Sequence, residues 1–171
     1  MKAADLNGPL VRVARRYRFS ASHRLHTHLL SAERNREVYG KCNNPYGHGH
    51  DYVMDVVLEG RLDPSTGRLA PLDLLDAFIH RVWLSQVDRR NLNLDLGEFA
   101  ALVPTTENLA VVAARRLQEA WPHWFGGHRV RLERIRIRET RNNIFEVLVP
   151  QAGPGGVESH EVIVEGRRQG T

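Results

Sequence analysis

The stretch from Cys42 to His50 gathers three residues that can do metal and acid–base chemistry. His48 and His50 are two residues apart and open an apolar run that continues to Leu58, a pattern typical of a β-strand. Side chains at positions i and i+2 of a strand share a face, so two imidazoles can reach one ion. Cys42 is the single cysteine of the chain, and its thiolate would be the reactive form beside such a metal.

A catalytic zinc site usually has three protein ligands and an open position, so we expect a third ligand. His23 is the best candidate, because it ends an alternating run that begins at Val11 and adjacent strand ends would bring it to the pair. On spacing alone, ordinary loop histidines remain an equal alternative, since His-x-His recurs by chance. His26 and His28 form a second such pair in a polar stretch, and we interpret them as solvated loop residues.

Five motifs in order resemble the 6-pyruvoyl-tetrahydropterin synthase family, over about Val11 to Val149. They are Phe-Ser-Ala-Ser-His at 19–23, Cys-Asn-Asn-Pro-x-Gly-His-Gly-His at 42–50, Asp-Pro-x-Thr-Gly at 63–67, Thr-Thr-Glu-Asn at 105–108 and Glu-Thr-x-Asn-Asn at 139–143. The first two motifs contain the residues that the chemistry singles out.

The resemblance implies a zinc-dependent carbon–oxygen lyase that eliminates triphosphate from 7,8-dihydroneopterin triphosphate while the side chain rearranges. Zn²⁺ held by His23, His48 and His50 would act as Lewis acid. Cys42 would be the general base, with a pKa lowered by zinc or by cationic side chains. Five residues separate Cys42 from His48, as in the pyruvoyl-forming branch. The alternatives left open are 6-carboxy-tetrahydropterin synthesis, or dihydropterin side-chain cleavage in a queuosine or deazapurine pathway.

Glu139 is the expected anchor for the pterin, because a carboxylate can accept both N–H groups of the 2-amino-4-oxo edge. Without its flanking motif, a solvated glutamate after the arginine-rich run 134–138 would be preferred. Thr105 and Thr106 resemble the substrate-side threonines of the family. They also precede an apolar helical series, so one of them can serve as its N-cap.

Asp88 and Arg89 mark a departure from the family, which has an Asp-His pair that relays protons to the cysteine. Arginine stays protonated in proteins, so Arg89 cannot exchange a proton as imidazole does. Three outcomes remain open. Arg89 stabilises the Cys42 thiolate or the phosphates in a slower reaction, His80 or His128 substitutes, or the protein binds pterin with weak or lost turnover.

Composition agrees with one soluble domain. A length of 171 residues with 42% hydrophobic residues fills one core. The formal charge of +4 suits a triphosphate substrate as well as nucleic acid, and no recognition motif supports the latter. The N-terminal residues lack the apolar segment of a secretory signal and no apolar run approaches a membrane span, so we expect a cytoplasmic location.

The periodicity predicts an α+β fold with a four-stranded antiparallel sheet and two helices on one face. The expected strands are 11–19, 52–58, 130–137 and 144–149, with a bulge between Leu132 and Ile135 where the apolar phase changes. The expected helices are 72–83 and 106–121. We expect one pterin synthase-like domain at 1–150, then a linker and tail at 151–171 whose apolar run 162–164 is either disordered or paired with a neighbour.

Family resemblance implies the tunnelling fold, in which subunits join their sheets into a β-barrel. It also implies a hexamer of two trimers with active sites at the subunit interfaces. Asp88 would then come from the chain next to the one that supplies Cys42. An open sheet leaves edges that invite such pairing.

Overall fold

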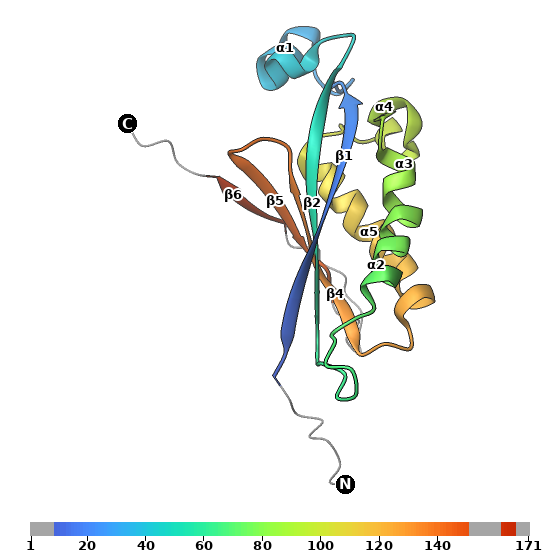
Figure 1. Cartoon of the computed structure of the whole chain (residues 1–171). Coiled ribbons are helices and arrows are strands. Elements are labelled where there is room, and N and C mark those ends of the chain that lie inside the picture. The colour runs from blue at the N-terminus through green and yellow to red at the C-terminus, as the bar shows by residue number, and fades with distance from the viewer. Residues whose placement is uncertain (1–8, 151–161, 167–171) are drawn as a thin grey trace.

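One mostly antiparallel sheet organises the computed structural model, which describes residues 9–150 and 162–166 (Figure 1). The strand order is β3-β1-β2-β4-β5-β6. The bounds are β1 Val11–His23, β2 His48–Gly60, β3 Arg90–Asn91, β4 Val130–Arg138, β5 Asn143–Leu148 and β6 Val162–Gly166. The four expected strands are therefore the central four. Two additions flank them, the two-residue β3, which pairs parallel with β1, and β6.

Helices cover one face of this sheet, as expected (Figure 1). The first expected helix is a continuous helical segment made of α2 Leu72–Ile79, a π-helical turn His80–Leu84 and α3 Ser85–Val87, and α4 Leu92–Asp95 follows. The second is α5 Thr106–Phe125, which continues through Pro122. A further helix, α1 Ala32–Tyr39, lies beyond the ends of β1 and β2 and was not expected. Among the described helices, none has the length and hydropathy needed to cross a bilayer.

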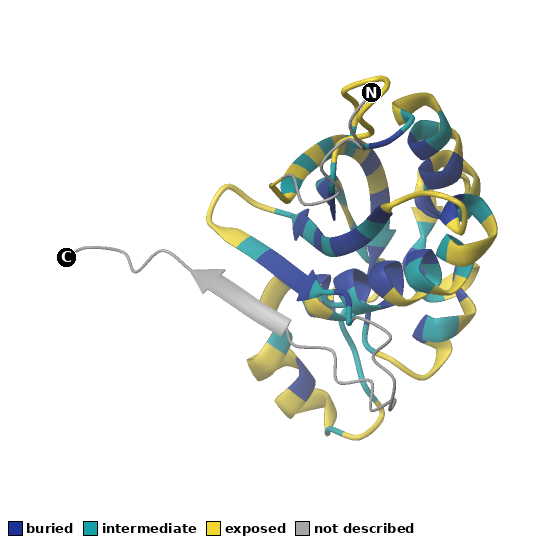
Figure 2. Ribbon diagram, turned by 90° about the horizontal axis from the view of Figure 1, so that it is seen from below, coloured by how far each residue is buried: buried dark blue, intermediate teal, exposed yellow. Residues whose placement is uncertain are grey.

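The core lies between the sheet and these helices, where the buried residues gather in Figure 2. Alternate residues of β2, from Tyr52 to Leu58, face the helices and are at most 1% exposed. They pack with Phe78 and Trp83 of the helical segment and with Leu109 of α5. The alternation follows from the pleat, which sends successive side chains to opposite faces of the sheet.

The helix-free face of the sheet is covered by ion pairs. Asp55 and Glu59 of β2 are 7% and 4% exposed although no helix covers them. The long side chain of Arg16 forms a bidentate pair with Asp55, at 2.7 and 3.1 Å, and Arg12 and Arg131 both bind Glu59. Arginine stems thus shield the carboxylates while the guanidinium groups stay near water.

The expected bulge in the third long strand is confirmed. Val57 lies opposite Arg134 and Leu58 lies opposite Leu132, so Glu133 has no partner on β2. The extra residue shifts the phase and lets both Leu132 and Ile135 face the core. The apolar tail run 162–164 belongs to β6, which pairs with β5 of the same chain. The linker at 153–156 lies outside the described residues.

Candidate metal centre and active site

Antiparallel pairing of β1 with β2 brings the three predicted histidines together. His23 is the last residue of β1 and lies directly opposite His48, the first residue of β2. His50 is two residues further along β2 and shares the helix-facing side of the sheet with both. One ligand atom from each residue lies within 4.8 Å of the others, and Nε2 of His23 is 3.3 Å from Nε2 of His48.

A backbone carbonyl orients the first of these rings. Nδ1 of His23 is 2.7 Å from the carbonyl oxygen of Pro104, the residue just before the N-cap of α5. Because a carbonyl only accepts hydrogen bonds, Nδ1 carries the proton and Nε2 keeps its lone pair for an ion. A partner of this kind typically fixes the tautomer of a metal-binding histidine. Sequence reasoning missed Pro104, since its side chain takes no part in the contact.

The electrostatic surroundings keep two of the imidazoles neutral. Burial lowers the pKa of His23, which is 1% exposed, and burial also lowers the pKa of His48, with a smaller contribution from His50. Metal binding requires neutral imidazoles, so this shift favours a ligand role. Nδ1 of His48 and Nε2 of His50 are buried and have no hydrogen-bond partner in the described part of the chain.

These residues fit a divalent metal ion. A tetrahedral ion about 2.0–2.1 Å from each nitrogen places two ligating nitrogens about 3.3–3.4 Å apart. The 3.3 Å between His23 and His48 agrees with that geometry. An unpartnered buried nitrogen on His50 is a second sign, because buried polar atoms are normally satisfied. Three imidazoles suit zinc and several other transition metals.

Glu139 lies beside the histidine cluster, immediately after the end of β4. Its Oε1 is 3.8 Å from Nε2 of His23 and 3.6 Å from Nε2 of His50. The same oxygen accepts a hydrogen bond of 3.3 Å from the hydroxyl of Tyr52. Burial, together with Glu139, raises the pKa of Tyr52, so this hydroxyl keeps its proton and donates. Tyr52 is a second residue that sequence reasoning missed, although its position two after His50 placed it on the same face.

Cys42 is half-buried in the 3-10 turn Gly40–Asn43, and its carbonyl accepts a hydrogen bond from the amide of Leu25. Burial raises the pKa of the thiol, the charge of Glu139 raises it further, and Lys41 opposes them. The lowered pKa expected for Cys42 therefore does not come from the protein groups of a single chain. A bound cation would act in the opposite direction to burial, because it stabilises a nearby thiolate.

The two threonines begin α5 and differ in their contacts. Thr105 is the N-cap, and its hydroxyl accepts a hydrogen bond from the amide of Asn108 at 3.3 Å. This confirms that one of the pair caps the helix. Thr106 is 4% exposed. Asn108 in turn donates to the carbonyl of Val103, which braces the loop that carries the Pro104 carbonyl.

Asp88 and Arg89 are exposed at the edge of the sheet beside β1. The carboxylate of Asp88 accepts a hydrogen bond from the amide of Ser20, and the amide of Arg89 donates one to the carbonyl of Ser20. Within residues 9–150, no hydrogen bond or ion pair joins either residue to Cys42. Arg89 adopts a positive φ of 58°, which is uncommon for arginine and more often found for asparagine or histidine.

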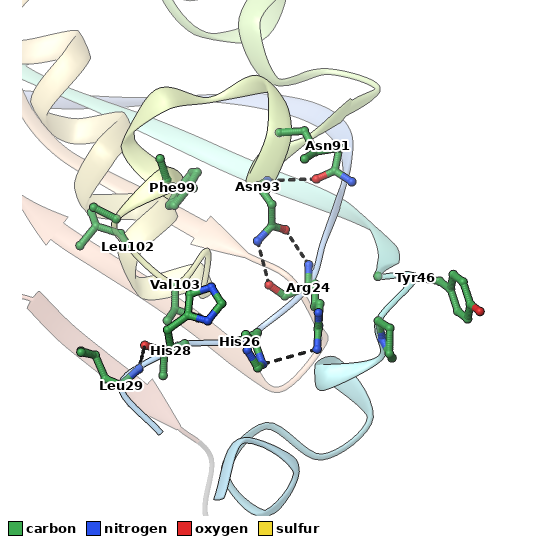
Figure 3. A pocket seen from close by; sticks show the side chains of 16 residues that line it. Arg24, His26, His28, Leu29, Tyr46, Asn91, Asn93, Phe99, Leu102 and Val103 are labelled. Atoms are coloured by element: carbon green, nitrogen blue, oxygen red, sulfur yellow. Dashed lines mark hydrogen bonds between the residues drawn. The ribbon is translucent and has the colours of Figure 1, made fainter. Parts of the chain in front are cut away.

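Four further histidines named in the sequence analysis lie apart from the cluster. His80 and His128 are both exposed. His128 lies two residues before Val130, which pairs with Gly60 at the far end of β2. At roughly 3.3 Å per residue, that end of the strand is about 40 Å from His48. His26 and His28 line a separate cavity with their rings 5.3 Å apart (Figure 3). His28 is exposed as expected, whereas His26 is half-buried and hydrogen-bonded to Asn43.

Helices cover one face of the sheet, and three histidines, a carboxylate and a thiol lie near one end of its two longest strands. This combination defines a metalloenzyme-like protein of the tunnelling fold. A single chain does not close into a barrel. Comparisons with known proteins agree with this class and narrow it. The family model described as 6-pyruvoyl tetrahydropterin synthase matches residues 12–149.

Two curated relatives and one solved structure illustrate the likeness. The 6-pyruvoyl tetrahydrobiopterin synthase of Poecilia reticulata is 47% identical over 126 residues, which are 74% of this chain and 82% of the relative. The Homo sapiens protein of the same name is 42% identical over 132 residues, covering 77% and 87%. The Caenorhabditis elegans 6-pyruvoyl tetrahydropterin synthase structure has a TM-score of 0.73 at 39% identity and covers 82% and 96%. The chain belongs to the 6-pyruvoyl tetrahydropterin synthase family.

Proposed function

We propose that this chain is a 6-pyruvoyl tetrahydropterin synthase, a lyase that eliminates triphosphate from 7,8-dihydroneopterin triphosphate with rearrangement of the side chain. The observation that carries the proposal is the convergence of His23, His48 and His50 within 4.8 Å, with Glu139 alongside. Curated synthases at 35–47% identity support the same activity. The catalytic domain is proposed to span residues 1–150, with residues 151–171 as linker and tail.

The proposed metal is Zn²⁺, held by the three histidines. Zinc supplies Lewis-acid stabilisation to negative charge that develops on a side-chain oxygen of the substrate. The donor set supports this assignment, because three neutral imidazoles leave room for a further ligand, as in catalytic zinc sites. The Pro104 carbonyl supports the role of His23, since it keeps Nε2 unprotonated.

Glu139 is proposed to bind the pterin ring and Cys42 to move the proton. A carboxylate accepts N–H groups of the pterin edge and so orients the ring. Cys42, electrostatically coupled to Glu139, takes a proton from a side-chain carbon as general base. Thr106 is proposed to contact the substrate, whereas Thr105 contributes through the helix N-terminus that it caps.

Asp88 and Arg89 are proposed to act on a neighbouring subunit. Their exposure at the sheet edge leaves both side chains available to a second chain. Arg89 would stabilise the thiolate or the departing phosphates by its fixed positive charge, because it cannot relay a proton. The reaction is then expected to be slower than with a histidine at this position.

A homo-oligomer, a hexamer of two trimers in the cytoplasm, completes the proposal. Among the described residues, only β3 pairs with β1 on the side away from β2, and it pairs only with residues 21 and 22, which leaves most of that edge unpaired. Four large apolar side chains surround the cavity of Figure 3 and are strongly exposed: Leu29 at 93%, Tyr46 at 95%, Leu94 at 81% and Leu102 at 43%. Clustered exposed apolar side chains are typical of a protein interface.

The direct test is to incubate the zinc-loaded protein with 7,8-dihydroneopterin triphosphate and identify the products by mass. We expect 6-pyruvoyl tetrahydropterin and triphosphate, and their loss in Cys42→Ala. A 6-carboxy product, or a pterin shortened by side-chain cleavage, would assign the protein to the deazapurine branch instead. Substrate that binds and is recovered unchanged would identify a pterin-binding protein without turnover.

A further inference from the structure

A column of three aromatic rings runs from the helices to the candidate site. Trp83, in the π-helical turn, is fully buried and contacts the ring of Phe19 edge-on, with centroids 6.2 Å apart. Phe19 lies opposite Tyr52 in the β1–β2 pairing and stacks on it, with centroids 5.1 Å apart and planes at 20°. Tyr52 is 1% exposed. Phe19 therefore covers one face of the Tyr52 ring, and burial leaves that ring little room to move.

The hydroxyl of Tyr52 points to Glu139 and engages only one of its two oxygens. Oε1 accepts the phenol hydrogen bond at 3.3 Å and also lies 3.6 Å from Nε2 of His50. Within residues 9–150, the polar contacts of Glu139 with Tyr52, His23 and His50 all use Oε1. Oε2 is left for a ligand. Hydrogen bonds of this kind are often long in the absence of substrate and shorten in the complex.

The position of Glu139 creates a chemical conflict. A carboxylate that binds zinc directly has its oxygen about 2.0–2.2 Å from the ion, and a fourth protein ligand closes the site. The Oε1 atom already lies beside two of the three imidazoles, so a small rotation of the flexible glutamate side chain would bring it into the coordination sphere. The donor that opposes this rotation in the described chain is the hydroxyl of Tyr52.

We propose that Tyr52 is a positioning residue that holds Glu139 out of the metal coordination sphere and so keeps one coordination position open and one carboxylate oxygen free for the pterin. The proposal rests on the proposed function for its pterin ligand. It makes the hydroxyl, rather than the ring, the functional part of Tyr52. Phe19 and Trp83 fix where that hydroxyl lies.

Tyr52→Phe tests the proposal, because it removes the hydroxyl and keeps the stacked ring. Tyr17→Phe is the matched control: Tyr17 also lies on β1–β2 and donates to a carboxylate, Asp76, at 2.8 Å, away from the histidines. The two readouts are the rate at which a chelator removes zinc and the dissociation constant for biopterin, measured by its fluorescence. Biopterin carries the recognition edge without the triphosphate.

We expect Tyr52→Phe to release zinc severalfold more slowly than wild type, while its dissociation constant for biopterin rises about tenfold, as for loss of a hydrogen bond to a charged group. Tyr17→Phe should change neither. In a Glu139→Ala background, Tyr52→Phe should have no further effect on either quantity. Slower zinc release combined with weaker biopterin binding is diagnostic, because a merely structural defect would weaken biopterin binding but speed zinc release.

Faster zinc release, or unchanged zinc release together with unchanged biopterin affinity, would overturn the proposal. Failure of the proposed function gives a different result. In that case wild type binds no biopterin, but the chelator experiment still reports whether the Tyr52 hydroxyl keeps Glu139 from the metal.

Discussion

His23, the last residue of β1, and His48, the first residue of β2, lie opposite each other at the end of the β1–β2 ladder, with their Nε2 atoms 3.3 Å apart. The pair is non-local, since twenty-four residues, including α1, separate them in the sequence. Two backbone strands hold the imidazoles at a spacing that suits one ion. The metal centre therefore depends on strand register, and the variants below test its consequences.

Replacing His48 by Ala should abolish stoichiometric zinc binding. The change removes one of three ligands, and two imidazoles do not hold a catalytic zinc site. Metal content after dialysis, measured by atomic emission, is the readout. His28→Ala is the control from the other His-x-His pair, and it should retain one zinc per chain. Full zinc content in a protein lacking both His48 and His50 would show that the site is elsewhere.

Acidification should destabilise the metal-free protein in the range below about pH 6.5. The pKa values of His23 and His48 are lowered in the folded state, so the unfolded chain takes up protons at a higher pH than the folded chain does. The free energy of unfolding then falls as pH falls through that window. Urea unfolding at pH 7.5 and 5.5 measures it. In a variant that carries both His23→Asn and His48→Asn, the free energy of unfolding should differ less between the two pH values than in wild type. An equal difference would show that these two histidines do not cause the pH dependence.

The thiol of Cys42 should react slowly with iodoacetamide in the metal-free protein at pH 8. Burial and the charge of Glu139 both raise its pKa, which leaves little thiolate. Glu139→Gln removes that charge and should speed alkylation, and zinc should speed it in wild type. The control Glu37→Gln, which changes an exposed carboxylate of α1, should leave the alkylation rate unchanged. Equal alkylation rates in Glu139→Gln and wild type would show that the two residues are not coupled.

Arg89→His should raise kcat by about a hundredfold or more, since a positioned general acid–base group contributes about 10²–10⁴-fold. Position 89 has a positive φ of 58°, a conformation that histidine adopts more readily than most residues. The substitution should therefore fold without added strain. Turnover of 7,8-dihydroneopterin triphosphate is the measurement, with the adjacent Arg90→His as control. A variant no faster than wild type would mean that arginine serves the reaction as well as histidine.

Gly60→Ala should lower the free energy of unfolding by about 1–3 kcal/mol, the usual cost of overpacking. A Cβ atom at Gly60 would lie 2.4 Å from the carbonyl oxygen of Arg129 and 3.1 Å from the side chain of Leu69. Gly97→Ala is the matched control, because its Cβ would meet nothing within 4 Å. Urea denaturation compares the two, and equal stabilities would contradict the close approach seen at the end of β2.

Local patterns predicted much of the fold. Alternation along 52–58 and the phase change after Leu132 correctly indicated a strand and a bulge, because the pleat fixes which side chains share a face. The helical segment from Leu72 was expected, but its π-helical turn at 80–84 was not. An extra residue per turn is stabilised by packing Trp83 into the core, and that packing involves partners distant in sequence. The short β3 and α1 carry too few apolar residues to be recognised from periodicity.

The sequence by itself determined the ligand types and the pairing of His48 with His50, because two residues apart on a strand is a local geometric relation. It also indicated that a carboxylate, Glu139, follows the strand expected at 130–137. Only the tertiary structure decided that the Pro104 carbonyl orients His23 and that the Tyr52 hydroxyl meets Glu139. Those contacts join segments up to 87 residues apart, and the packing of the whole core sets their positions.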